Sequence, residues 1–238
     1  MKRLLSSIGI GAATVDTVLP QAEVHPGERV ELAVELIGGD SAQRIDGLYF
    51  TLTADAGGDE WVVDRYGFDG SFEIGPGDER TERVTIRVPV WTPVTRGGPH
   101  VRLETGVDID WAVDPTDSDE VAVAPDEFVA AVFAACEDLG FTFTSSSVVE
   151  TPWLDDRPFA QELVFEPGER FEQDVSKLVL TTIPRGDDLR LYIQVQQRDE
   201  VAEAVGQDFN EQEVSVTVTY ANPEMIGRRI TSTIDQFR

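Results

Sequence analysis

Hydrophobic and polar residues alternate along much of this chain. In the clearest case, residues 101–113, every second residue is Val, Leu, Thr, Ile or Trp, and most residues between them are charged or small. A pleated strand places such a series on one face, whereas a helix would scatter it around its axis. The pattern predicts a long half-buried strand, with Trp111 anchoring its apolar face in a core.

The same period of two recurs in both halves of the chain. It covers residues 30–36, 48–54, 84–90, 189–195 and 214–220. Strands with one wet face are typical of antiparallel sheets that pack in pairs. Pro26-Gly27, Pro76-Gly77 and Pro167-Gly168 predict turns between strands, because proline presets the first turn position and glycine supplies the positive φ of the second.

Two segments have helical spacing instead. The first has Asp126 as a candidate N-cap and Gly140 as its end, with apolar residues at Phe128, Val132, Ala135, Cys136 and Leu139. The second begins at Asn222-Pro223, and its apolar stripe consists of Ile226, Ile230, Ile234 and Phe237.

The acidic segment 114–120, which contains Pro115, separates the two halves and is followed by Pro125. We therefore predict an N-terminal domain over residues 1–124 and a C-terminal domain over residues 125–238, each of a common domain size. The expected fold class is all-β: two β-sandwich domains in tandem, with a short helix at the junction and a second helix at the C-terminus.

The formal net charge is −26, from 45 acidic and 19 basic residues. Nucleic acid is excluded as a partner on this ground, since phosphate neutralisation needs clustered Lys and Arg, and an anionic membrane surface is disfavoured for the same reason. Only Lys2 and Lys177 are lysines. Such a surface suits a cytosol of molar salt, where charges are screened. The alternative is an acidic surface for a basic partner.

Cys136 is the only cysteine, so no intramolecular disulfide can form and a reducing, cytoplasmic compartment is expected. The apolar stretch 4–15 is too short and interrupted to span a bilayer, and no membrane insertion is expected. It also has the outline of a signal peptide, with Lys2 and Arg3 before it, which leaves a secreted structural protein as an alternative.

Candidate chemistry is sparse. His25 and His100 adjoin turn sequences. The chain has only these two histidines and one cysteine, which is too few for a zinc site of the usual Cys and His kinds without a carboxylate ligand. Asp108 and Asp110 would lie about 7 Å apart on one strand face, near glycosidase spacing, but they also match an ordinary solvated face. A calcium ion could be bound by the clustered carboxylates of Asp114, Asp117, Asp119 and Glu120, but their order does not match an EF-hand loop. We expect no catalytic residue, metal site or cofactor. We expect Cys136 to be buried and to pack as a small apolar residue.

Two segments resemble the sporulation-control protein M family. They are SIGIGAATVDTVL at residues 7–19 and TGVDIDWAVDPTDSD at residues 105–119. The resemblance extends in order along the whole chain and implies an arrestin-like pair of β-sandwiches in the cytoplasm, acting as a regulator or scaffold that binds protein partners. The alternative from another class is a hydrolase, metal-dependent or carboxylate-using, built on the acidic strand.

The charge makes the protein's stability depend on salt. Dilution from about 1 M to about 0.1 M KCl lengthens the Debye screening distance from roughly 3 Å to roughly 10 Å, so that surface carboxylates repel one another again. We expect the melting temperature to rise steeply across a KCl series. A midpoint that stays constant from dilute to molar salt would contradict the prediction.

Overall fold

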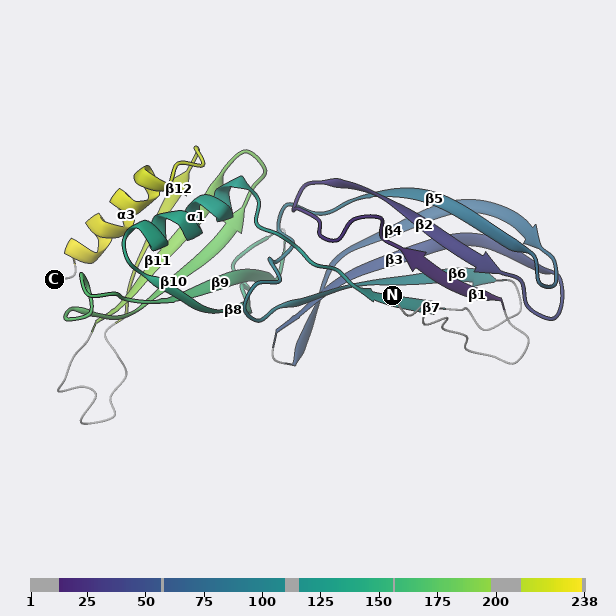
Figure 1. Ribbon diagram of the computed structural model, residues 1–238, viewed down its shortest axis with the longest axis horizontal. Coiled ribbons are helices and arrows are strands. Elements are labelled where there is room, and N and C mark those ends of the chain that lie inside the picture. The colour runs from purple at the N-terminus through teal and green to yellow at the C-terminus, as the bar shows by residue number, and fades with distance from the viewer. Residues whose placement is uncertain (1–12, 57, 110–115, 156, 198–210, 237–238) are drawn as a thin grey trace. The chain divides into compact units, whose positions relative to one another are not determined.

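The computed structural model describes residues 13–56, 58–109, 116–155, 157–197 and 211–236 (Figure 1). The chain divides into two compact units. Unit one consists of Met1–Thr92 and His100–Val123, and unit two consists of Pro93–Pro99 and Ala124–Arg238. The seven residues Pro93–Pro99 therefore belong to unit two, whereas the sequence pattern places them in the first domain.

The described residues of unit one form seven strands in two antiparallel sheets. Sheet order is β1-β2-β5 in one and β4-β3-β6-β7 in the other. The strands are β1 (Thr14–Val18), β2 (Arg29–Ile37), β3 (Gln43–Ala56), β4 (Asp59–Ile74), β5 (Glu79–Arg87), β6 (His100–Ile109) and β7 (Thr116–Glu120). Alternate residues of β2, β3 and β6 are buried, so the two sheets share one apolar core between them.

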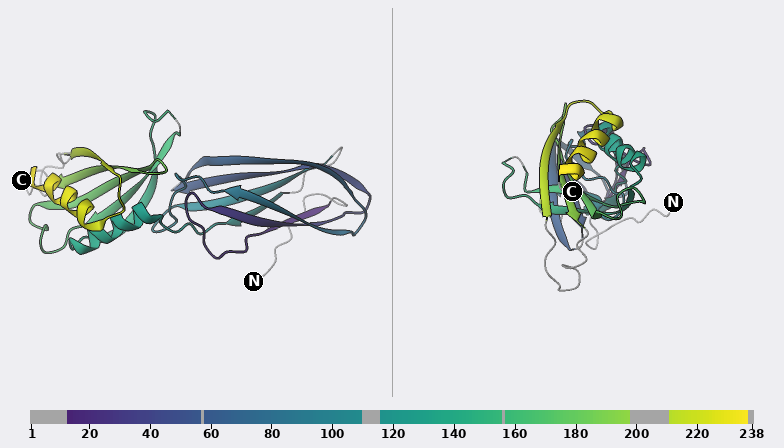
Figure 2. Two further views of the ribbon diagram at one scale, coloured as in Figure 1. Left: turned by 90° about the horizontal axis from the view of Figure 1, so that it is seen from above. Right: turned by 90° about the vertical axis from the view of Figure 1, so that its left-hand side faces the viewer.

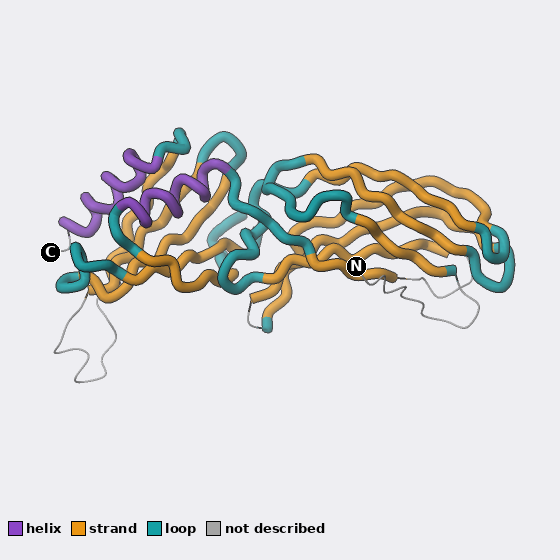
Figure 3. Tube along the Cα trace, viewed as in Figure 1, coloured by secondary structure: helices purple, strands orange, loops and turns teal. Residues whose placement is uncertain are grey.

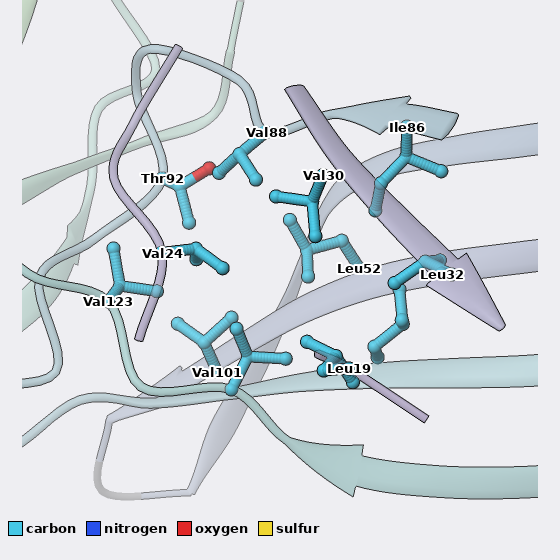
Figure 4. Close-up of a pocket in the computed structure, with 12 residues that line it drawn as sticks. Leu19, Val24, Val30, Leu32, Leu52, Ile86, Val88, Thr92, Val101 and Val123 are labelled. Atoms are coloured by element: carbon cyan, nitrogen blue, oxygen red, sulfur yellow. The ribbon is translucent and has the colours of Figure 1, made fainter. Parts of the chain in front are cut away.

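A small void lies within this core (Figure 4). Its walls come from both sheets and include Leu32, Leu52, Ile86 and Leu103, with Thr92 as the one polar residue. The void has a volume of about 10 Å³, which is at the lower limit of what a single water needs, roughly 10–15 Å³. It is a packing gap rather than a ligand site.

In its described residues, unit two is a five-stranded antiparallel sheet covered by two helices. Its order is β12-β11-β10-β9-β8. The strands are β8 (Thr142–Glu150), β9 (Phe159–Glu166), β10 (Val175–Pro184), β11 (Leu189–Gln197) and β12 (Glu211–Val218), and the helices are α1 (Glu127–Asp138) and α3 (Pro223–Gln236). Figures 2 and 3 show both helices on the same face of the sheet, where their apolar residues join its core.

Both helices begin where capping chemistry predicts. The side chain of Asp126 accepts a hydrogen bond from the Val129 N–H at 2.8 Å, and that of Asn222 accepts one from the Met225 N–H at 3.0 Å. Gly140, with φ of 87°, follows the end of α1. The predicted stripe Ile226, Ile230 and Ile234 is buried, whereas Phe237 lies outside the described residues.

The predicted fold class is confirmed as mostly sheet with a junction helix and a C-terminal helix. The second layer of unit two differs from expectation, because the described strands form one sheet and the two helices take the place of a second sheet. An amphipathic helix buries its stripe on a sheet as effectively as another sheet does. Strand periodicity alone therefore does not reveal which layer covers a sheet.

Three local predictions need correction or fall outside the structure. Tyr220, assigned to a strand face, follows the end of β12 and is 70% exposed. Gly168 lacks the positive φ that Gly27 and Gly77 adopt; a Cβ there would overlap the Gly140 carbonyl oxygen, so close approach explains the glycine. Trp111 lies outside the described residues.

Candidate functional site

One edge of the unit-two sheet is covered by its own chain. This edge is β8, whose pairing with β9 shifts register between Phe143 and Ser145. Beyond that shift the Ser146 N–H donates to the Gly97 carbonyl at 2.9 Å, and the Ser146 hydroxyl donates to the Arg96 carbonyl at 2.6 Å. A bulge and a covering segment both prevent a foreign strand from pairing with an edge.

The covering segment Pro93–Pro99 is held by a side chain that imitates a strand. The buried amide of Gln161 accepts from the Val94 N–H at 2.9 Å and donates to the Val94 carbonyl at 2.8 Å. Val94 itself is 2% exposed within the core of unit two. Both backbone groups of Val94 are thus satisfied where water cannot reach them.

Two glycines allow this segment to lie close to β8. A Cβ on Gly97, which has φ of 82°, would come within 2.6 Å of the Phe143 ring. A Cβ on Gly98 would overlap the Ser146 carbonyl oxygen, which is a backbone atom and cannot turn away. Only glycine fits this approach.

The opposite edge of the sheet, β12, shows none of these protections in the part of the chain that the structure describes. Its register with β11 is unbroken from Val218 opposite Leu189 to Glu211 opposite Gln196, and it contains no proline. Among the described residues, no backbone hydrogen bond reaches its outer edge. Val214 and Val216 are half-buried, so they offer apolar surface beside that edge. Within its described residues, unit two therefore has one closed edge and one open edge.

The two histidines stay apart from any described cluster of metal ligands. His25 is exposed, and its backbone N–H donates to the Glu28 carboxylate at 2.9 Å. His100 is exposed at the start of β6, with Nδ1 4.0 Å from the Glu120 carboxylate. In the part of the chain that the structure describes, no group of three or more His, Cys, Asp or Glu residues could hold a metal ion.

The described carboxylates considered for catalysis or calcium binding lie either on the protein surface or in the edge strand β7. Asp108 is exposed on β6, and Asp110 and Asp114 lie outside the described residues. Asp117 of β7 accepts from the Thr17 N–H of β1 at 2.8 Å, and the Thr17 hydroxyl bonds to the Thr105 hydroxyl at 2.7 Å. These bonds connect β1, an edge strand of one sheet, to β7 and β6 of the other sheet, which is a structural role.

Asp119, two residues further along β7, has an unusual environment. Burial, followed by the nearby negative charges and hydrogen bonding of Asp117 and the charge of Asp16, raises the pKa of Asp119 to about 7. Its Oδ2 is buried without a hydrogen-bond partner among the described residues. Glu120 beside it is exposed.

Cys136 is fully buried on α1 against the sheet, as predicted. Burial raises the pKa of the thiol, so the reactive thiolate is disfavoured. Sequence reasoning missed the segment Pro93–Pro99 and its receptor Gln161. The glycine pair before Pro99 was the available signal, but nothing local indicated that its partner lies on β9.

These features define a class: a mostly β protein of two units, in which no described backbone segment pairs with the β12 edge of the unit-two sheet. The model of one family, described as SpoOM protein, matches residues 1–199. The chain belongs to this Spo0M family. None of the described helices is both long and apolar enough to cross a membrane.

Two relatives extend the match. The chain is 30% identical over 235 residues to the sporulation-control protein Spo0M of Bacillus subtilis (strain 168), covering 94% of this chain and 91% of the relative. The crystal structure of Spo0M from Bacillus subtilis superposes with a TM-score of 0.82 at 27% identity, covering 96% of this chain and 100% of that one. The predicted resemblance is confirmed.

Replacement of Gly98 by alanine tests the covered edge. The added Cβ must displace the segment from β8, and overpacking of this kind costs about 1–3 kcal/mol. We expect Gly98→Ala to lower the stability of unit two and to accelerate amide exchange at Ser146. Gly70→Ala is the control, since its Cβ meets no atom within 4 Å. Unchanged protection at Ser146 would contradict the close approach.

The raised pKa of Asp119, about 7 instead of 3.8, also has a consequence for stability. The folded state holds this proton more tightly than the unfolded state, so stability falls as pH rises from about 4 to about 7 and then levels. Asp119→Asn should stabilise the protein at pH 8 more than at pH 4. Asp108→Asn removes the same charge from an exposed position and should show a smaller pH-dependent difference. Equal pH profiles for the two variants would refute the assignment.

Proposed function

We propose that this protein is a cytoplasmic regulatory or scaffold protein that captures an extended segment of a protein partner on the free edge of β12. The single observation that carries the proposal is the contrast between the edges of unit two. One edge has a bulge and a covering segment, and the other is regular and bare within the described chain. Open edges are usually protected, because they template strand addition.

The surroundings of β12 fit an extended peptide. Alternate residues of an added strand would extend the helix-covered face of the sheet and contact the half-exposed Val214 and Val216. The outward-facing residues Glu213, Ser215 and Thr217 leave the other face polar. The partner segment should therefore alternate apolar and polar residues.

Two further residues favour a protein partner at this end. Tyr220, directly beyond β12, is 70% exposed, and Met225 in the first turn of α3 is 51% exposed. Tyrosine and methionine are enriched at protein interfaces. The membership in the Spo0M family supports a regulatory role, and the relative's name makes sporulation control the process to examine first.

Proline substitutions at two successive positions of β12 test whether its outer edge binds the partner. Two positions are used because only one of the two backbone N–H groups points away from β11. Successive N–H groups of a strand point to opposite edges, so one of Ser215→Pro and Val216→Pro removes a bond to β11 and the other removes only an outward donor. We expect the latter to retain more of the parent's melting temperature and yet to lose binding. Thr217→Ala, which keeps every backbone group, is the control.

The partner is first isolated by a pull-down in molar KCl and then purified for titration. Affinity should hold or improve from about 1 M to about 3 M salt, because screening weakens ion pairs and leaves apolar contacts intact. Loss of binding in high salt, or no new amide protection along β12, would reject the proposal. A dimer that the outward-facing proline converts to a monomer would assign the edge to a second copy instead.

A further inference from the structure

A cleft on the covered side of unit two carries an inference separate from the β12 edge. It is lined by Arg96 of the covering segment, by Phe133 and Glu137 of α1, and by phenylalanines around β8 and β9. Its volume is about 240 Å³, below the roughly 300 Å³ at which pockets begin to hold drug-sized molecules. The cleft fits one amino-acid residue.

The aromatic wall of the cleft is preorganised. The rings of Phe133 and Phe143 meet edge to face with centroids 5.1 Å apart, and Phe165 packs against Phe143 at 5.6 Å. Phe141 and Phe165 are buried, whereas Phe133 and Phe143, which also line the cleft, are half-buried. An apolar side chain entering here would replace water on these rings.

Arg96 supplies the polar part of the cleft. Its guanidinium carbon lies 4.7 Å from the Phe133 ring centroid and 5.0 Å from that of Phe143. Among the described residues no carboxylate forms an ion pair with it. A guanidinium held by cation–π contacts keeps its N–H donors for a bidentate carboxylate.

The carboxylate of Glu137 determines which kind of anion the cleft favours. It is exposed on α1, one turn beyond Phe133, and its negative charge lies in the same cleft. A second negative charge on the ligand, as in a phosphate, would be repelled, whereas a carboxylate with an adjacent amide N–H offers one anion and one donor. A chain end with an apolar last residue has this combination of groups.

We propose that the cleft of Arg96, Phe133, Glu137 and Phe143 binds the C-terminal carboxylate and last apolar side chain of a protein partner. The site lies beside β8, at the opposite edge of the sheet from β12. It therefore adds a second, independent contact to the protein rather than restating the strand-addition surface.

The probe is N-acetyl-L-phenylalanine, which has the carboxylate, amide and ring of a chain end. It is titrated in about 1 M KCl and followed by NMR at the Arg96 guanidinium and the two rings, with roughly millimolar binding expected. N-acetyl-L-phenylalaninamide, which lacks the charge, should bind at least about tenfold more weakly, the loss expected for a charge-assisted hydrogen bond. Equal binding of acid and amide, or no saturable shift, would overturn the proposal.

Variants of Arg96 then locate the effect. Arg96→Gln should abolish the preference for the acid, and Arg96→Lys should reduce it, because an ammonium cannot form the bidentate pair. Arg170→Gln is the matched control, since Arg170 also lies over a ring, that of Phe171 at 4.8 Å, but outside this cleft. Free phenylalanine binding about tenfold more tightly would identify a site for the amino acid itself and reject the chain-end assignment. Acid and amide are compared on the parent protein, so the test holds even if a variant fails to fold.

Discussion

The reciprocal pairing of the Gln161 amide with the backbone of Val94 is the interaction on which the organisation of unit two depends. A buried backbone N–H and carbonyl without partners would each cost about 1–3 kcal/mol. Gln161 satisfies both from one side chain, and its backbone is held in turn, since the Thr182 hydroxyl donates to the Gln161 backbone carbonyl at 3.1 Å. This pairing keeps a segment that departs from unit one inside the core of unit two.

Several other features follow from that one pairing. With Val94 fixed, Gly97 and Gly98 reach the edge of β8 and close it, and Arg96 lies over the aromatic rings. The sheet is then left with a single bare edge, β12, in its described part. A sheet with two open edges would invite association on both sides, whereas one closed edge makes strand addition directional.

The large negative charge acts at a different level from these contacts. Described ion pairs such as Arg83–Glu31 and Arg228–Glu224 involve exposed side chains, which contribute little to stability. Cohesion therefore comes from the two apolar cores and from buried hydrogen bonds, and both persist in concentrated salt. Asp119 is an exception, because its carboxyl group is half-buried beside Asp117 rather than exposed to solvent.

The sequence by itself determined the local elements. Alternation specified β2, β3 and β11, and Asp126 and Asn222 specified the starts of both helices, because these signals act between residues close in the chain. Only the tertiary structure decided which residues close or open an edge. Gln161 and Val94 are 67 residues apart in sequence, and no local sequence pattern predicts that they pair. The same holds for Arg96 and the rings beneath it, which come from three separate elements brought together by the fold.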